Sequence, residues 1–421
     1  MTCDHPDEGM YFHKCKDGQE LTGPGIHALV IGMSNYSRAD EPDKSAGQPD
    51  KSDDRRGKRR ASKVKPIFPD IPGAASGAVR FAQYLESGFG SPHSIPLHTV
   101  RLLLSPVDDE SIWLPDRGRW ELAEYWNVYD ALEDWAAECD TNAGNLAILY
   151  IAGHGAVTGA GTQNIFLGEA NRIQDRYLAS INVETIQELM KFYRAISNLY
   201  IFDCCAKDDN PEIPDYTGSP GMTIPAHETM TADVTRKKSI EGKRAYWTRI
   251  NAARVGTSTP ALGAKDGTLL SWALLPLLMS AGEMVDSRFT VTTQKLNAEL
   301  LPAMSRRRRI TIPDEGGPKV TVGENDPLGI TCPTPPPEFE ISLINDLGAD
   351  GGTVIFTITD PGTGEQVKRL EVTSSSPPFG LAAGSYKVKA EEFKGNSQRS
   401  HSFDVDVLRD LRISYDGAEA K

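Results

Sequence analysis

The sequence predicts an α/β fold, a mostly parallel sheet flanked by helices, followed by a small all-β sandwich domain, and three observations lead to this prediction. Short apolar runs bounded by turn residues are typical of strands buried on both faces, and they lie at 26–33, 97–104, 145–153 and 198–205. Segments with helical spacing of apolar residues alternate with these runs, which indicates right-handed βαβ units. Beyond residue 338 the apolar period changes to two, which indicates a separate β-sandwich.

The remaining elements of the α/β part follow from the same patterns. A further strand is predicted at 248–256, and helices are predicted at 74–87, 120–139, 181–196, 268–281 and 293–304. The helix from Trp120 to Cys139 carries large apolar residues at helical spacing, and these are expected in the core: Leu122, Trp126, Tyr129, Leu132 and Trp135.

Composition excludes several classes of protein. The net charge of -13 argues against a nucleic-acid partner, because phosphate contacts need a basic face. The longest apolar run falls short of the roughly 20 residues that span a bilayer, and the N-terminus is acidic where a secretory signal would be basic, so a cytoplasmic protein without a membrane partner is expected. Six scattered cysteines do not resemble a disulfide framework.

The chain of 421 residues is expected to fold as two main domains. The predicted organisation is an N-terminal tail at 1–25, an α/β domain at 26–325, a Pro-rich linker at 326–338 and the β-sandwich at 339–421. Two long polar loops interrupt the α/β domain, a disordered insertion at 37–66 and a second loop at 206–245. In the tail Cys3, His5, His13 and Cys15 could hold zinc, although a tail without metal is favoured because their spacing is tighter than in common zinc fingers.

Two of the predicted strands run directly into reactive side chains, His154 and Cys205. Ligands of open α/β sheets bind outside the carboxyl ends of the strands, so these two side chains are expected to meet over one crevice. A neighbouring base favours the thiolate of a cysteine and makes it a nucleophile, and His154 is the candidate base. The backbone N–H groups of Gly155 and Cys205, at strand-to-loop turns, are candidates for an oxyanion hole.

Strand alternation distinguishes the two adjacent thiols. Cys205 shares a face with Asp203, while Cys204 shares the other face with Phe202, because side chains of a strand alternate. Cys205 is also nearest the end of the strand, so it is the predicted nucleophile and Cys204 is a buried structural thiol. Asp203 is then a candidate carboxylate in the floor of a pocket, where it would attract a cationic substrate side chain.

The motifs Ala152-Gly-His-Gly155 and Phe202-Asp-Cys-Cys205, whose His and last Cys are 51 positions apart (205 minus 154), resemble those of the caspase and metacaspase superfamily of cysteine peptidases. The resemblance covers 26–309 and includes the Gly-Ala-led helix at Gly73, the Asn-Ala-Ala strand at Asn251 and the helix following Gly267, but not the β-sandwich. It implies a caspase-like sheet of the caspase-hemoglobinase fold, shared with gingipains, and roles in cell death or defence.

By this resemblance Cys205 is the nucleophile, His154 is the general acid and base, and Asp203 recognises a basic residue, Arg in preference to Lys, before the bond that is cleaved. The sequence departs from the family at two places. Metacaspase-like sequences commonly carry an Asn-Asp pair where this chain has Ser76-Gly77, and a Ser where it has Ala152. The expected basic specificity therefore rests on Asp203 alone.

The resemblance also implies control by proteolysis of the two loops. Candidate processing sites are Arg60, Arg236, Lys238 and Arg244, cut either by the protein itself or by an upstream activating protease. No cofactor is expected. Acidic residues after Cys205 could bind Ca²⁺, as in some metacaspases, although a solvated acidic loop is the commoner explanation.

Two alternatives to a peptidase that cleaves protein substrates after basic residues stay open. One is an Asp-specific caspase-type protease, which Asp203 disfavours because like charges would meet in a dry pocket. The other is a catalytically silent scaffold or sensor that acts through its β-sandwich, which the presence of both His154 and Cys205 disfavours.

Overall fold

The computed structural model divides the chain into two compact units, one made of 1–86, 95–274 and 300–327 and the other of 87–94, 275–299 and 328–421. Within them the structure describes residues 10–13, 23–36, 68–91, 94–157, 162–172, 176–195, 197–205, 207–208, 246–253, 261–286, 288–308, 318–322, 329–333, 336–347, 352–361, 363–394, 397–407 and 411–415.

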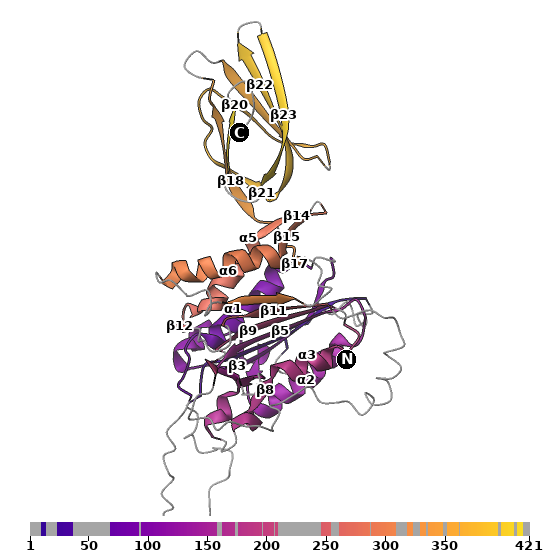
Figure 1. The fold of residues 1–421 in the computed structure, drawn as a ribbon, viewed down its shortest axis with the longest axis vertical. Helices are drawn as coiled ribbons and strands as arrows, with labels where there is room; N and C mark the ends of the chain where they lie inside the picture. Colours follow the sequence, from indigo (N-terminus) through magenta and orange to yellow (C-terminus); the bar gives the residue numbers. More distant parts are fainter. Residues whose placement is uncertain are drawn as a thin grey trace, which may run out of the picture. The chain divides into compact units, whose positions relative to one another are not determined.

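An eight-stranded, largely parallel sheet forms the centre of the first unit, with the order β1-β3-β2-β5-β9-β11-β16 and with β4 beside β3 (Figure 1). The parallel strands are β2 (Ile26–Met33), β3 (Leu97–Ser105), β4 (Glu121–Leu122), β5 (Leu146–Gly153), β9 (Ser197–Cys204) and β11 (Tyr246–Asn251), and the antiparallel edges are β1 (Met10–His13) and β16 (Lys319–Val322). The predicted α/β class with a central sheet containing parallel strands is confirmed.

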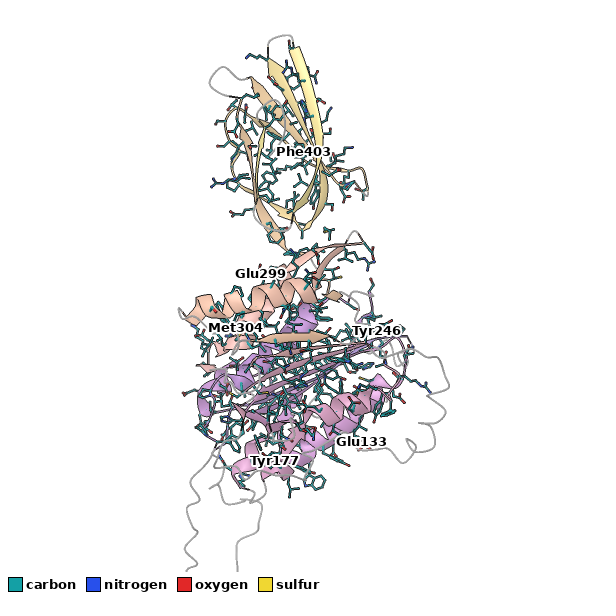
Figure 2. The ribbon with its side chains drawn as sticks, viewed as in Figure 1. Glu133, Tyr177, Tyr246, Glu299, Met304 and Phe403 are labelled. Atoms are coloured by element: carbon teal, nitrogen blue, oxygen red, sulfur yellow. The ribbon has the colours of Figure 1, made fainter. Side chains whose placement is uncertain are left out.

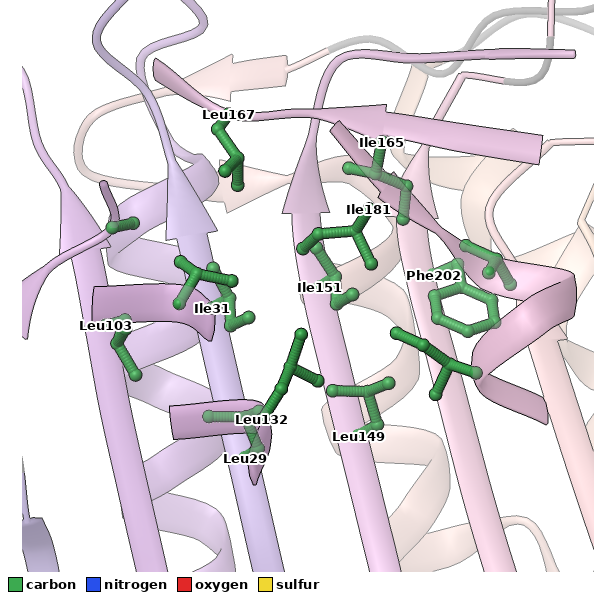
Figure 3. Packing of buried hydrophobic residues seen from close by; sticks show 14 of the residues in the cluster. Leu29, Ile31, Leu103, Leu132, Leu149, Ile151, Ile165, Leu167, Ile181 and Phe202 are labelled. Atoms are coloured by element: carbon green, nitrogen blue, oxygen red, sulfur yellow. The ribbon is translucent and has the colours of Figure 1, made fainter. Parts of the chain in front are cut away.

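Helices cover both faces of this sheet. They are α1 (Ala74–Ser87), α2 (Tyr125–Cys139), α3 (Val183–Met190), α5 (Leu269–Ser280) and α6 (Thr293–Arg308). Figure 1 shows α2 and α3 on the face opposite α1. Apolar side chains of β2 and β5, such as Leu29 and Leu149, pack with Leu132 of α2 in one buried cluster (Figure 3). Side chains fill the space between sheet and helices (Figure 2), which explains why the strands are apolar on both faces.

The start of α1 is held by buried acceptors rather than by a residue of its own. Glu110, in the 3-10 helix Asp108–Trp113, is 0% exposed and accepts from the amides of Gly73 and Ser76 at 2.7 and 3.2 Å. Ser34 Oγ donates to Glu110 at 2.9 Å and accepts from the amide of Ala75 at 2.8 Å. These bonds satisfy helix-terminal N–H groups and fix α1 against the end of β2.

A small sheet with the order β10-β6-β7-β8 continues the central sheet at the carboxyl ends of β5 and β9. Its strands are β6 (Gly155–Val157), β7 (Gln163–Phe166), β8 (Ser180–Asn182) and β10 (Lys207–Asp208). Only His154 separates β5 from β6, and β10 begins two residues after Cys205. A short hairpin, β12 (Ala261–Gly263) with β13 (Gly267–Thr268), leads into α5.

The second unit contains a three-stranded sheet and two sheets that share a hydrophobic core. The three-stranded sheet consists of β14 (Gly282–Val285), β15 (Arg288–Thr292) and β17 (Gly329–Thr331). The two remaining sheets have the orders β21-β18-β24 and β20-β19-β22-β23, built from β18 (Glu338–Asn345), β19 (Thr353–Thr359), β20 (Gln366–Val372), β21 (Phe379–Ala382), β22 (Gly384–Lys394), β23 (Ser397–Val407) and β24 (Leu411–Tyr415). Alternating residues such as Val354, Phe356 and Ile358 form their common core, in keeping with period two.

Part of the expected tail and part of the expected linker are ordered strands. Within 1–25, β1 pairs with β3. This strand is held by its side chain Tyr11, which is buried and whose ring centroid lies 4.1 Å from the guanidinium carbon of Arg119. Within 326–338, β17 pairs with β15, because Ile330 is buried at its centre. Cys3, His5 and Cys15 lie outside the described residues, as do 37–66 and most of 206–245.

The helix expected from Trp120 begins later, at Tyr125. Glu121 and Leu122 instead pair with β3 as β4, and the amide of Tyr125 donates to Glu169 Oε2 at 2.7 Å, which starts the helix there. Trp126 is 69% exposed, so the expectation that it lies in the core was wrong. Among the helices that the described ranges contain, none is both long and apolar enough to cross a bilayer.

Candidate active site

The register of the strands places His154 directly beside Cys205. β5 and β9 run parallel with Gly153 opposite Cys204, and β6 and β10 run parallel with Ala156 opposite Lys207. The offset is the same before and after the two residues, 51 positions (204 minus 153 and 207 minus 156). His154 and Cys205 are separated by the same 51 positions, so they lie opposite each other on neighbouring segments of the backbone. Neighbouring strands of a sheet are about 4.8 Å apart.

The two adjacent thiols lie in different environments, as strand alternation predicts. Cys204 belongs to the buried cluster that contains Phe202 and α2, and it is 3% exposed. Burial raises the pKa of its thiol well above the usual range, and Gln163 Nε2 donates to its sulfur at 3.2 Å. Cys205 is only half-buried. Of the two thiols, Cys205 is therefore the more accessible one.

His154 is held through its backbone and its ring. Its amide donates to Tyr36 Oη at 2.9 Å, and its carbonyl accepts from the amide of Phe166 at 2.9 Å. Nε2 of the ring lies 2.8 Å from the carbonyl oxygen of Pro69. Because a carbonyl only accepts, Nε2 carries the proton in this contact, and Nδ1 of the neutral ring is the nitrogen that can accept one.

The side of the imidazole is enclosed by aromatic rings. The ring of Tyr36 meets it edge-on at a centroid distance of 4.8 Å, and the ring of Phe68 lies 5.3 Å away. Asn171 Nδ2 donates to the carbonyls of Tyr36 and Phe68 at 2.9 and 2.8 Å, and Asp70 Oδ1 accepts from the amide of Tyr36 at 2.7 Å. The two chain segments that flank 37–67 are thus tied together, which fixes the carbonyl of Pro69 under the imidazole.

Asp203 lies on the face opposite Cys204, in a buried set of neutral hydrogen-bond donors. Its carboxylate is 3% exposed and accepts from Tyr150 Oη at 3.0 Å and from the hydroxyl of Thr268. Burial raises the pKa of Asp203 to about 6, against the lowering effect of Thr268, Tyr150 and the backbone of Ser271. In the described part of the chain, no Lys, Arg or His forms an ion pair with this carboxylate.

The donors around Asp203 belong to the start of α5. Thr268 Oγ1 accepts from the amide of Ser271 at 3.1 Å, and Ser271 Oγ accepts from the amide of Thr268 at 3.1 Å, which is a reciprocal helix cap. The positive end of the helix is consequently close to the carboxylate and favours its ionised form. A sequence in which Thr and Ser stand three residues apart before an apolar run is a weak signal for this cap.

Gly77 of α1 lies against the same hydroxyls. A Cβ at this position would come 2.9 Å from Ser271 Oγ and 3.4 Å from Tyr150 Oη, so hydroxyl groups already fill the space that a larger side chain would need. The second acid that metacaspase-like sequences carry here has no room in this chain. Asp203 is the acid that the site offers.

Gly155 is the first residue of β6 and pairs with Ile165, so it does not lie at the strand-to-loop turn that the sequence predicts. A Cβ on Gly155 would collide with the carbonyl oxygen of Cys205, so the two backbones are in contact and only glycine leaves room. The candidate processing sites Arg60, Arg236, Lys238 and Arg244 lie outside the described residues. Among the residues that are described, no group of three or more His, Cys, Asp or Glu side chains could hold a metal ion.

Comparisons with known proteins add little to this geometry. No protein-family model matches the sequence, and no curated protein matches it. Among solved structures, the chain is similar to protein GSU0716 from Geobacter sulfurreducens, with 15% sequence identity and a TM-score of 0.39 over 73% of this chain and 98% of that one. A similarity this low does not assign the protein to a class. Its fold and site describe it as an α/β protein with a Cys–His pair at the carboxyl edge of its sheet.

Proposed function

We propose that the protein is a cysteine endopeptidase of caspase-like fold that cleaves protein substrates after a basic residue, Arg in preference to Lys. The observation that carries the proposal is the common 51-residue offset on both sides of the pair, which sets His154 beside Cys205 at the ends of two adjacent parallel strands. This edge of an open α/β sheet is where ligands bind.

The residues support acyl transfer through a thioester. The Cys205 sulfur attacks the carbonyl carbon of the substrate while His154 Nδ1 takes the thiol proton, and the tetrahedral oxyanion forms. Collapse of this intermediate breaks the C–N bond, and His154 returns the proton to the leaving amine. Water then attacks the thioester, gives its proton to His154, and releases the acid and the Cys205 thiol.

Gly155 suits a role in binding the oxyanion. The Phe166 amide donates to the carbonyl of His154, so in the alternating antiparallel ladder the peptide groups of Gly155 point away from β7. They face the side of β10, the parallel partner of β6. Because Gly155 lies next to the Cys205–His154 pair and Cys205 belongs to it, their amides are the proposed oxyanion-hole donors.

Basic specificity follows from the charge of Asp203. Above its pKa of about 6 the carboxylate is anionic, and among the described residues its hydrogen-bond donors are hydroxyl and amide groups. The guanidinium of a substrate arginine would pair with this anion, whereas an aspartate side chain would place a second anion beside it. This charge argument favours basic specificity over Asp specificity.

Control by proteolysis belongs to the same proposal. Arg60, Arg236, Lys238 and Arg244 all satisfy the proposed specificity, so the protein could cut its own loops, and an upstream protease is the other route. Mass spectrometry of the chain termini after incubation of wild type and of the inactive Cys205 variant separates the two routes.

The test compares Cys205→Ala with Cys204→Ala on peptides that differ only in having Arg, Lys, citrulline or Asp before the scissile bond. Cys205→Ala is expected to abolish cleavage after Arg, whereas Cys204→Ala, which shortens a buried side chain, retains it. Retained activity in Cys205→Ala contradicts the assignment of the nucleophile. A wild-type protein in which an arginyl chloromethylketone labels no cysteine, even after proteolytic nicking, is the outcome that favours the scaffold or sensor.

A further inference from the structure

The ladder between β6 and β7 is interrupted at His154. Gly155 is opposite Ile165 and Ala156 is opposite Asn164, so the next opposed pair is His154 and Phe166. A hydrogen-bonded antiparallel pair exchanges two N–H···O bonds. One is present, from the amide of Phe166 to the carbonyl of His154 at 2.9 Å.

A tyrosine hydroxyl stands in the place of the other bond. The amide of His154 donates to Tyr36 Oη at 2.9 Å, and Tyr36 Oη donates to the carbonyl of Phe166 at 3.0 Å. Two bonds through one oxygen span a wider gap than the single bond of about 2.9 Å that a regular ladder would have. The hydroxyl thus holds the amide of His154 away from β7.

Tyr36 is itself fixed on every side. It is 1% exposed, its amide donates to Asp70, and its carbonyl accepts from Asn171. A Cβ on Gly153 would come 2.7 Å from Tyr36 Oη, so the glycine before His154 leaves the room that the hydroxyl occupies. Burial raises the pKa of the hydroxyl far above its usual value, so it remains a donor as well as an acceptor.

We propose that Tyr36 is a positioning residue for the Cys205–His154 pair: its hydroxyl, inserted into the β6–β7 ladder, holds the backbone of His154 at the place where its imidazole serves Cys205. The inference rests on the proposed function. Without the hydroxyl, the amide of His154 can pair directly with the carbonyl of Phe166, which moves the imidazole relative to Cys205 and to the carbonyl of Pro69.

The test is Tyr36→Phe, which keeps the ring against the imidazole and removes only the inserted oxygen. The kcat for an arginyl peptide is expected to fall about 100-fold with KM within about twofold, because displacement of a catalytic group by about 1 Å costs about this much. The pH–rate profile for alkylation of Cys205 by iodoacetamide, measured by peptide mass spectrometry, is expected to move towards that of free cysteine, near 8.5.

The matched control is Tyr200→Phe. Tyr200 is 2% exposed and belongs to the same buried cluster, but it takes no part in the hydrogen bonds of His154. Its variant is expected to keep kcat and the alkylation profile of the wild type, whatever it loses in thermal stability. An equal loss of kcat in both variants would show a general effect of removing a buried hydroxyl and would overturn the inference.

Gly153→Ala provides a second, independent variant. Its new Cβ would lie 2.7 Å from Tyr36 Oη and 2.9 Å from Met33 Cε, so it is expected to lower kcat about tenfold in the wild-type background and by a smaller factor in the Tyr36→Phe background, where the contact with the oxygen is absent. Additive effects of the two substitutions would contradict the inserted hydroxyl. If Tyr36→Phe does not fold, Gly153→Ala decides alone, and an unchanged kcat then overturns the inference.

Different results would overturn the role of Tyr36 and the proposed function. A wild type that cleaves after Arg, with a Tyr36→Phe variant equal to it within twofold, overturns the role of Tyr36 and leaves the proposed function intact. A wild type that neither cleaves peptides nor reacts with an arginyl chloromethylketone overturns the proposed function itself.

Discussion

Two carboxylates of the first unit, the largely covered Glu138 and the buried Asp203, are held in opposite ways. Glu138 of α2 pairs with Arg101 at 2.8 Å, accepts from Thr99 at 2.8 Å and lies 3.7 Å from His27. Burial raises its pKa, but the hydrogen bond from His27 and the charge of Arg101 outweigh burial, so the net pKa is lowered. The charge of this carboxylate is neutralised within the fold.

In the part of the chain that the structure describes, Asp203 forms no ion pair with a Lys, Arg or His. Hydroxyls of Tyr150 and Thr268 hold its carboxylate, and burial raises its pKa to about 6. Asp203 also lies at the carboxyl end of β9, the edge at which ligands of parallel sheets bind, whereas Glu138 contacts His27 near the start of β2 and Thr99 and Arg101 in the first half and middle of β3. Neutral donors alone do not distinguish Asp203, because the buried Glu110 is also held by amides and a hydroxyl. The place at the carboxyl end of β9 is what sets Asp203 apart.

The largest expected effect comes from Asp203→Asn. Loss of the carboxylate is expected to lower kcat/KM for an arginyl peptide about 1000-fold, because removing one partner of a buried charge pair costs about 4 kcal/mol. Cleavage of the matched citrulline peptide and alkylation of Cys205 are expected to persist. Equal losses on both peptides would show that Asp203 supports the fold of the site and not its specificity.

The same substitution is expected to stabilise the fold. Because the folded pKa of Asp203, about 6, lies above its ordinary value of 3.8, ionisation costs stability, and this cost is absent below about pH 3.8 and complete above about pH 6. Asp203→Asn removes it and is expected to raise the free energy of unfolding at pH 7.5 by up to about 3 kcal/mol. Urea unfolding at pH 4 and pH 7.5 measures the difference.

Glu138→Gln is expected to have the opposite effects. It leaves Arg101, which is 5% exposed, with Asp134 at 3.1 Å as its remaining carboxylate, so it is expected to cost about 2 kcal/mol of stability, less than the loss of a sole buried partner. The folded fraction of Glu138→Gln is expected to cleave the arginyl peptide at the wild-type rate. Urea unfolding and peptide kinetics on the same preparation test both statements, and a specific loss of Arg cleavage would remove the contrast with Asp203.

The position of the His154–Cys205 pair could be predicted from the sequence because it needs only two local rules. His154 and Cys205 each follow an apolar run, and parallel strands end at one edge of a sheet. Alternation along one strand then separated Asp203 from Cys204, and the structure has them on opposite faces. The end of an apolar run and the alternation of side chains are read within one segment, so neither requires knowledge of which distant segments meet.

The residues that support the pair could not be predicted in this way. Tyr36 and Thr268 are neutral side chains without a reactive motif, and their bonds to His154 and Asp203 join positions 118 and 65 residues apart. Helical spacing likewise failed for Trp126, because the spacing gives a face of the helix but not the width of the surface that covers it. Contacts of this kind depend on how segments pack, which a single sequence does not encode locally.

The pH dependence of specificity tests the charge of Asp203 directly. The ratio of kcat/KM for arginyl and citrulline peptides cancels the titration of Cys205 and His154, which both substrates share. Because protonation removes the anion, this ratio is expected to be constant above about pH 7 and to fall towards tenfold per unit as the pH drops below about 6. In Asp203→Asn the ratio is expected to be flat, and a flat wild-type ratio would contradict the role of the carboxylate.

The smallest expected effect belongs to Thr268→Val, which removes one of the two hydroxyl donors to Asp203. A hydrogen bond to a charged group contributes about 1.5 kcal/mol, so the pKa of Asp203 is expected to rise by about one unit, and the midpoint of the arginyl-to-citrulline ratio moves with it. Thr268 also caps α5, so the stability of the variant falls as well, but a loss of stability does not move the midpoint of the ratio.

Thr290→Val, at a buried threonine with no contact to Asp203, is the matched control, and its midpoint is expected to equal that of the wild type. An unshifted midpoint in Thr268→Val would mean that the hydroxyl serves the helix cap alone and that Tyr150 and the Ser271 backbone suffice to hold the anion.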